Sequence, residues 1–234
     1  MPLLFPLLLI MFATSPIFAQ SFNAVQDFSL NSNPNGAWSY GYTPTRGGAL
    51  TLFTDKSTVF PRLNCPGFNA WYAANLPLQL PSVIKNVTGA TQPCTAGIVQ
   101  PADVLNLHPG SRGENSVVRW TAPASGQLTI QGKFTAVDSI ATTDVAVLLN
   151  SNTVLFSGDI NGAGSSLPFS LTQTVKAGDR IDFSVGFGKN GNFFSDSTGL
   201  AVQILTPPLA LSQTGLTFKT VIGGVPCPPG HSTC

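Results

Sequence analysis

Two pairs of adjacent aromatic residues have side chains that could bind a sugar. Trp71 and Tyr72 lie in an irregular, proline-rich segment at 57–101, and Phe193 and Phe194 lie in a loop rich in Gly and Asn. Sugar sites commonly stack an aromatic ring on the apolar face of a pyranose and add a few fixed polar groups for its hydroxyls. We therefore expect these four residues to form an exposed ligand platform, with packing in the core as the alternative role of Trp71 and Tyr72.

A second aromatic set lies nearer the N-terminus. Trp38, Tyr40 and Tyr42 alternate with Ser39 and Gly41, which places the three rings on one face of a predicted strand. Such alternation more often marks a core face, so these residues rank below the first four as ligand contacts. Trp120 is expected to lie in the core.

Catalytic chemistry has little support in the sequence. Glycoside hydrolysis uses two carboxyl groups that flank the bond, and the one glutamate, Glu114, could pair with Asp103 near His108. The segment 108–114 is explained more simply as a turn before a strand. The glycine spacing at 186–191 follows a predicted strand but precedes no helix, so it indicates a turn and not a dinucleotide site. We expect no enzymatic activity.

The charge balance limits the partners of this chain. Lys and Arg total 11 and Asp and Glu total 10 among 234 residues, so there is no basic field to attract nucleic acid or anionic lipid. The apolar run at 1–19 ends in Ile-Phe-Ala and predicts a signal peptide that is cleaved after Ala19. An uncleaved anchor is the alternative, which Pro6 and Pro16 disfavour. After cleavage no bilayer-spanning run remains, so we expect a secreted protein.

Export also permits disulfide bonds. The four cysteines, Cys65, Cys94, Cys227 and Cys234, allow three pairings. The most economical pairing joins Cys65 to Cys94 and Cys227 to Cys234. The first of these bonds would staple the long irregular segment.

The remaining pattern is that of short strands separated by turns. Residues 115–134 predict a hairpin, in which Leu128, Ile130 and Phe134 share one face of the second strand. Residues 144–149 and 153–157 predict a hairpin with a polar turn at 150–152, and alternation recurs at 167–171, 181–187 and 200–204, with no convincing helix. We predict an all-β, antiparallel β-sandwich (jelly roll) at 20–205, followed at 206–234 by a linker and a short strand-like tail.

Several segments carry a resemblance to known domains. The sequences APASGQLTI at 122–130, DVAVLL at 144–149, KAGDRIDF at 176–183 and DSTGLAVQI at 196–204 resemble galactose-binding-like jelly rolls, which serve widely as carbohydrate-binding modules. DFS at 27–29, NPNGAWSYG at 33–41, LHPG at 107–110 and SVVRW at 116–120 resemble an exported bacterial domain of the PEP-CTERM-associated type. Residues 211–224 look like the first strand of a bacterial Ig-like (BACON-type) repeat. The chain would then be a piece of a longer protein.

The resemblance also implies a structural calcium ion. In the modules that this chain resembles, an acidic residue near the final strand takes part in binding Ca²⁺, which prefers oxygen ligands. Asp196 matches that position, and Asp27 near the first strand is a candidate companion. The alternative role of Asp196 is to cap its own turn through Asx-type hydrogen bonds.

Together these observations predict a secreted, non-catalytic module that binds an extracellular polysaccharide or cell-surface glycan. The alternative is a structural protein of the envelope or exopolysaccharide matrix that binds no defined small ligand.

Overall fold

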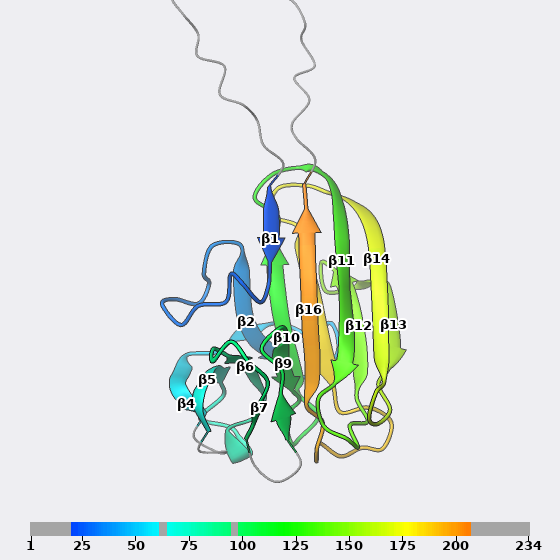
Figure 1. The fold of residues 1–234 in the computed structure, drawn as a ribbon. Helices are drawn as coiled ribbons and strands as arrows, with labels where there is room; N and C mark the ends of the chain where they lie inside the picture. Colours follow the sequence, from blue (N-terminus) through cyan, green and yellow to red (C-terminus); the bar gives the residue numbers. More distant parts are fainter. Residues whose placement is uncertain (1–19, 61–64, 95–97, 207–234) are drawn as a thin grey trace, which may run out of the picture.

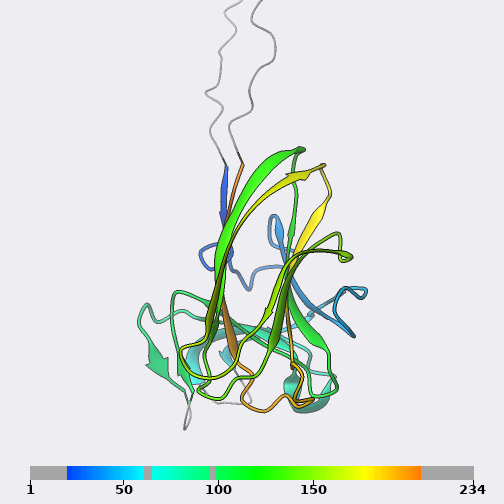
Figure 2. The ribbon, with the colours of Figure 1, turned by 90° about the vertical axis from the view of Figure 1, so that its right-hand side faces the viewer.

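The computed structural model describes residues 20–60, 65–94 and 98–206. Two antiparallel sheets form the two layers of a sandwich, and Figure 2 shows the layers edge-on. The predicted signal peptide at 1–19, the tail beyond Thr206 and the pair Cys227 and Cys234 lie outside the described residues.

The larger sheet has eight strands in the order β14-β11-β16-β9-β6-β5-β4, with β1 also paired to β16 (Figure 1). Its strands are β1 (Ser21–Asn23), β4 (Asp55–Phe60), β5 (Cys65–Tyr72), β6 (Ser82–Asn86), β9 (Leu105–His108), β11 (Gly126–Ala136), β14 (Ser166–Val175) and β16 (Thr198–Leu205).

The smaller sheet has six strands in the order β13-β12-β15-β10-β2-β3. They are β2 (Trp38–Thr43), β3 (Thr51–Leu52), β10 (Asn115–Thr121), β12 (Asp144–Leu149), β13 (Thr153–Asp159) and β15 (Arg180–Gly186). A separate hairpin pairs β7 (Gln92–Pro93) with β8 (Val99–Gln100), and one short 3₁₀ turn, η1, spans Pro77–Gln79. The predicted all-β, antiparallel β-sandwich class is confirmed.

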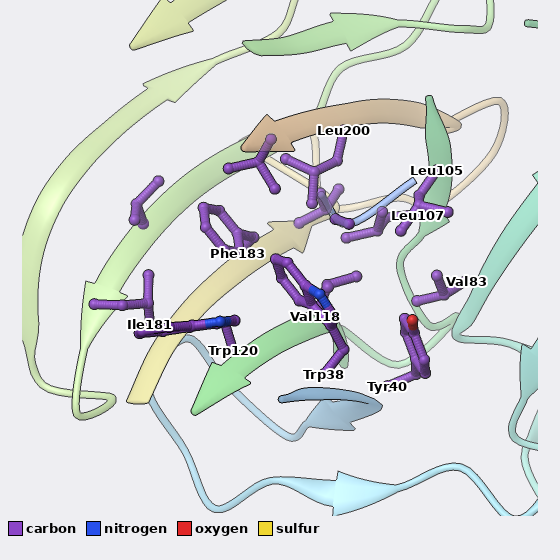
Figure 3. Close-up of a cluster of buried hydrophobic side chains, with 14 of the residues drawn as sticks. Trp38, Tyr40, Val83, Leu105, Leu107, Val118, Trp120, Ile181, Phe183 and Leu200 are labelled. Carbon is purple, nitrogen blue, oxygen red and sulfur yellow. The ribbon is translucent and has the colours of Figure 1, made fainter. Parts of the chain in front are cut away.

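The core lies between the two sheets because strand alternation turns every second side chain inward. Figure 3 shows Trp38, Trp120 and Phe183 from the smaller sheet facing Leu105 and Leu200 from the larger sheet. All five are essentially excluded from solvent. The predicted core position of Trp120 is confirmed, and Trp38 and Tyr40 are core residues as well.

The predicted hairpin at 115–134 is wrong. Strand β10 pairs with β2 and β15 in the smaller sheet, whereas β11 pairs with β14 and β16 in the larger sheet. The residues between them cross from one layer to the other, with Ala122 bonded to the turn at 176–179. Alternation identifies the buried face of each strand, but it does not identify the partner strand.

A second, smaller apolar cluster covers the outer face of the larger sheet. Phe60, Phe68 and Ile84 pack there beside the disulfide that joins Cys65 to Cys94, so the predicted pairing of these two cysteines is confirmed. Since Cys94 follows β7, the bond fastens the β7–β8 hairpin to strand β5. Within the described ranges, no helix has the length and apolar character that a membrane span requires.

Candidate functional site

The candidate site begins on strands β6 and β9, which are neighbours in the larger sheet. Val83, Leu105 and Leu107 face the main core. The alternate residues of these strands therefore face outward, and the register pairs Ser82 with His108 and Ile84 with Asn106. These four side chains form a floor on the outer face of the sheet.

Three segments enclose a cavity of about 390 Å³ above this floor. Ile98 at the end of the β7–β8 hairpin forms one wall, and the loop at 138–140 and the segment at 194–197 form the others. Ile98 and Asp138 are joined by an antiparallel β-bridge, so two of these walls support each other. A volume of this size lies within the range of small-molecule sites.

Two exposed apolar side chains stand at the cavity. Phe194 is 64 % exposed and Ile140 is 66 % exposed, and both line it. Phe193 packs against Phe194 with ring centroids 4.4 Å apart, and its ring meets the His108 ring edge-on at 6.4 Å. Of the predicted pair at 193–194, Phe194 therefore lines this cavity and Phe193 packs behind it between Phe194 and His108.

The floor also contains buried polar atoms without hydrogen-bond partners. Among the residues that the structure describes, the Oγ of Ser82 and the Oδ1 of Asn106 have none, although the Nδ2 of Asn106 donates to the Oε1 of Gln100 over 2.8 Å. A buried polar group left unsatisfied costs about 1–3 kcal/mol, so most such groups in proteins are hydrogen-bonded. Both atoms are buried, so a polar ligand in the cavity reaches them only when neighbouring side chains move aside.

Two buried carboxyl groups belong to the same walls: Asp138 lines the cavity, and Asp196 lies between the lining residues Ser195 and Ser197. The Oδ2 of Asp138 accepts a hydrogen bond from the backbone N–H of Ser197 at 3.3 Å, and the Oδ1 of Asp196 accepts one from the backbone N–H of Thr142 at 2.9 Å. The loops at 137–143 and 195–198 are thereby tied together. The alternative prediction, that Asp196 caps its own turn, is wrong. Its side chain instead accepts a hydrogen bond from Thr142 in the other loop.

Burial alters the acidity of both carboxyl groups. It raises the pKa of Asp138 despite the hydrogen bonds from Ser197. It raises the pKa of Asp196 to about 6, with the charges of Asp138 and Asp144 acting in the same direction. The second oxygen of Asp196, Oδ2, is buried and has no hydrogen-bond partner within the described part of the chain.

The prediction that Trp71 belongs to an exposed platform is wrong. Its side chain is 3 % exposed and lies in the main core, where the indole N–H donates to the carbonyl of Ser29 at 2.8 Å. The residue sits in strand β5 rather than in a loop, and alternation turns it inward. Lys56 covers the ring, with its Nζ 5.6 Å from the ring centroid.

Tyr72 faces the opposite way from Trp71 and is half-buried. It packs edge-on against Phe60 at 6.3 Å and lines a separate shallow cavity with Tyr42 and Phe53. The structure therefore does not bring the four predicted aromatic residues together on one surface. It separates Trp71 and Tyr72 from the pair at 193–194.

The residues proposed to bind calcium are also kept apart. The Oδ2 of Asp27 accepts hydrogen bonds from the backbone N–H of Asn23 and from the indole N–H of Trp38. Asn23 pairs with Gln203 late in strand β16, whereas Asp196 precedes the start of that strand. About 20 Å of strand separates the two positions. No cluster of three or more acidic, His or Cys side chains suited to a metal occurs within the described ranges, and these two residues do not fit a shared ion.

The carboxyl groups considered for catalysis do not form a pair. The Oε2 of Glu114 accepts the backbone N–H of Arg112, and Gly110 bonds to the Glu114 carbonyl, so residues 110–114 form the turn before β10 that the sequence indicates. Asp103 is exposed and lies outside the lining of the cavity. Residues 186–191 form a turn after β15, as predicted.

The sequence alone does not single out Ser82, Asn106 or Asp138 as site residues, and it indicates a turn at His108. A signal was present at 105–108, where Leu alternates with Asn and His. That alternation places a polar pair on the non-core face of a strand. Nothing local marks Asp138, because its position depends on the distant Ser197.

No protein-family model matches this sequence, and a search of curated protein sequences finds no relative. Solved structures are similar to it only at low identity. A family 51 carbohydrate-binding module from Clostridium perfringens in complex with methyl-galactose is 12 % identical, covers 80 % of this chain and 100 % of its own, and has a TM-score of 0.35.

A family 35 carbohydrate-binding module from Cellvibrio japonicus is 10 % identical, with coverage of 61 % of this chain and 94 % of that chain and a TM-score of 0.32. GITRL from pika is 16 % identical, with coverage of 42 % and 75 % and a TM-score of 0.26. At this level of similarity, neither the ligand nor the function of this chain follows from these structures.

Proposed function

We propose that this protein is a secreted, non-catalytic module that binds an extracellular or cell-surface glycan in the cavity above strands β6 and β9. One observation carries the proposal. The cavity of about 390 Å³ combines an exposed aromatic ring, Phe194, with buried polar atoms of Ser82 and Asn106 that lack partners within the described part of the chain. Sugar sites need this combination of an apolar stacking surface and fixed polar groups.

The lining of the cavity also supports a binding role over a hydrolytic one. Asp138 is the one carboxylic acid among the described lining residues. Hydrolysis of a glycosidic bond normally uses two carboxyl groups on opposite sides of that bond. The carboxyl group of Asp196 is completely buried behind the wall and does not face the cavity as a second acid.

A glycan array with purified protein tests the proposal. We expect binding to at least one glycan and a loss of about tenfold or more in affinity on Phe194→Ala, because stacking and its buried area are removed. Val154→Ala is the matched control, since Val154 is 53 % exposed on edge strand β13, which does not line the cavity. A clean negative with folded wild-type protein would contradict the proposal and favour a structural protein of the envelope or matrix.

A further inference from the structure

The charge distribution around the cavity points to a particular class of sugar. The ionisable side chains in its described lining are His108 and Asp138, and no Lys or Arg belongs to it. Asp196 lies between two lining residues, Ser195 and Ser197. One carboxylic acid, Asp138, therefore faces this cavity and a second, Asp196, lies behind its wall, while His108 is the one basic side chain in the described lining.

The hydrogen bonds of these acids leave part of their capacity unused. Asp138 is 4 % exposed, and it accepts hydrogen bonds from the backbone and the side chain of Ser197, with the backbone N–H 3.3 Å from its Oδ2. Asp196 is fully buried, and its Oδ2 accepts no bond from any described residue. A carboxylate can accept about four hydrogen bonds, so both groups can accept more than they receive. Burial destabilises an ionised carboxylate that has too few hydrogen-bond donors around it. A positive charge nearby stabilises the ionised form.

The floor adds neutral groups that suit a sugar. The Oδ1 of Asn106 accepts hydrogen bonds, and the Oγ of Ser82 can both donate and accept; neither has a partner among the described residues. An anionic sugar would meet the Asp138 carboxylate, and the described lining holds no Lys or Arg to balance its charge. A protonated amine would instead supply donors for the carboxylate and the amide oxygen.

We infer, on the basis of the proposed function, that the cavity selects a sugar with a free protonated amino group, a hexosamine residue, and that Asp138 determines this selectivity. The ammonium group would lie near Asp138, with the sugar ring against Phe194. Asp196 adds negative charge from behind the wall. Acidic sugars would be excluded by repulsion.

Calorimetric titration with matched oligosaccharides tests the inference. The probes are β-1,4-linked tetramers of glucosamine, of N-acetylglucosamine and of glucose, used at about pH 6.5, where an exposed amine remains mostly protonated. We expect the glucosamine tetramer to bind at least about tenfold more tightly than the other two, which corresponds to about 1.4 kcal/mol. Asp138→Asn should abolish this preference.

Asp103→Asn is the matched control, because it removes one exposed carboxylate outside the cavity and should keep the preference. A second test uses the wild-type protein alone, so a folding defect in Asp138→Asn cannot affect it. The wild type is titrated with each tetramer in buffers of different ionisation enthalpy. The buffer dependence gives the net number of protons exchanged on binding, which should differ between the amine and the acetylated tetramer, because only the amine carries a charge that interacts with the Asp138 carboxylate.

The outcomes separate the two claims. Equal binding of all three tetramers, or a preference that survives Asp138→Asn, would overturn the selectivity and leave glycan binding intact. No binding of any tetramer to folded protein would overturn the selectivity for amino sugars, while the wider glycan array decides whether the cavity binds another glycan.

Discussion

Asn106 donates a hydrogen bond from its Nδ2 to the Oε1 of Gln100 over 2.8 Å, and this bond joins the floor of the cavity to its hairpin wall. Asn86 makes a parallel connection by donating to the backbone carbonyl of Gln100, also over 2.8 Å. The disulfide between Cys65 and Cys94 and the bridge between Ile98 and Asp138 fasten the same hairpin. The β7–β8 hairpin, which forms this wall of the cavity, is therefore attached to the rest of the structure by hydrogen bonds, a disulfide and a β-bridge.

Removal of the Asn106 side chain should affect both stability and binding. Asn106→Ala leaves the Oε1 of Gln100 without its donor, and we expect the free energy of unfolding to fall by about 1–3 kcal/mol. Glycan affinity should fall as well, because the amide is part of the floor. Urea unfolding and titration measure the two effects. Unchanged affinity in a folded variant would show that the floor does not contact the ligand.

The disulfide between Cys65 and Cys94 closes a segment of 29 residues. Replacing both cysteines with serine should lower the free energy of unfolding by about 3–4 kcal/mol, because a bond across such a segment restricts the unfolded chain. It should also weaken glycan binding, because the hairpin wall loses its covalent attachment to β5.

The matched control replaces Cys227 and Cys234 with serine and should leave the affinity unchanged. Chemical unfolding and titration of both double variants give the comparison. Full affinity after loss of the Cys65–Cys94 bond would mean that the hairpin is not required as a wall of the site.

Trp71 should contribute to stability and not to ligand contact. Because its ring is buried in the main core, Trp71→Ala should lower the free energy of unfolding by about 3–5 kcal/mol. Phe194→Ala, at an exposed position, should change it by no more than about 0.5 kcal/mol. Thermal and urea unfolding of the two variants give the comparison. Loss of binding in a Trp71→Phe variant of full stability would contradict this assignment.

Asp196 should make stability depend on pH. Its pKa in the folded protein, about 6, lies above the value of 3.8 for a free carboxyl group, so folding favours the protonated form. The resulting stabilisation is present below about pH 4 and is lost as the pH rises through about 6; its size is at most about 3 kcal/mol. Asp138, whose pKa is also raised, acts in the same direction.

Asp196→Asn should therefore reduce the fall in unfolding free energy between about pH 4 and pH 7. Urea unfolding across this range measures the difference, with Asp103→Asn as the control that keeps the wild-type slope. An identical slope in Asp196→Asn and wild type would show that the buried carboxyl group does not titrate in this range.

The sequence was sufficient to predict the class of fold, because alternating residues in short strands reveal one buried face per strand. It was not sufficient to predict which strands pair, and the segment at 115–134 consequently crosses between sheets instead of forming a hairpin. The disulfide pairing of Cys65 was predicted by economy of spacing and is confirmed.

The candidate site was predicted only in part. The ligand role of Phe193 and Phe194 follows from their place in a loop rich in Gly and Asn and stays a prediction; of the two, Phe194 lines the cavity. The prediction for Trp71 is wrong because the many prolines of its segment hide strand β5. Asp138 is held by Ser197, which is distant in the chain, and Asn106 bonds to Gln100 across the turn between β8 and β9; neither contact leaves a local sequence pattern.

Chemical-shift mapping of the isotopically labelled protein with the glucosamine tetramer tests the central claim most directly. We predict that the largest changes on titration cluster at Asn106, His108, Phe194 and Ser197, around the cavity above β6 and β9. Changes concentrated instead around Tyr42 and Tyr72, or spread over the exposed face of β11 and β14, would contradict the location of the site.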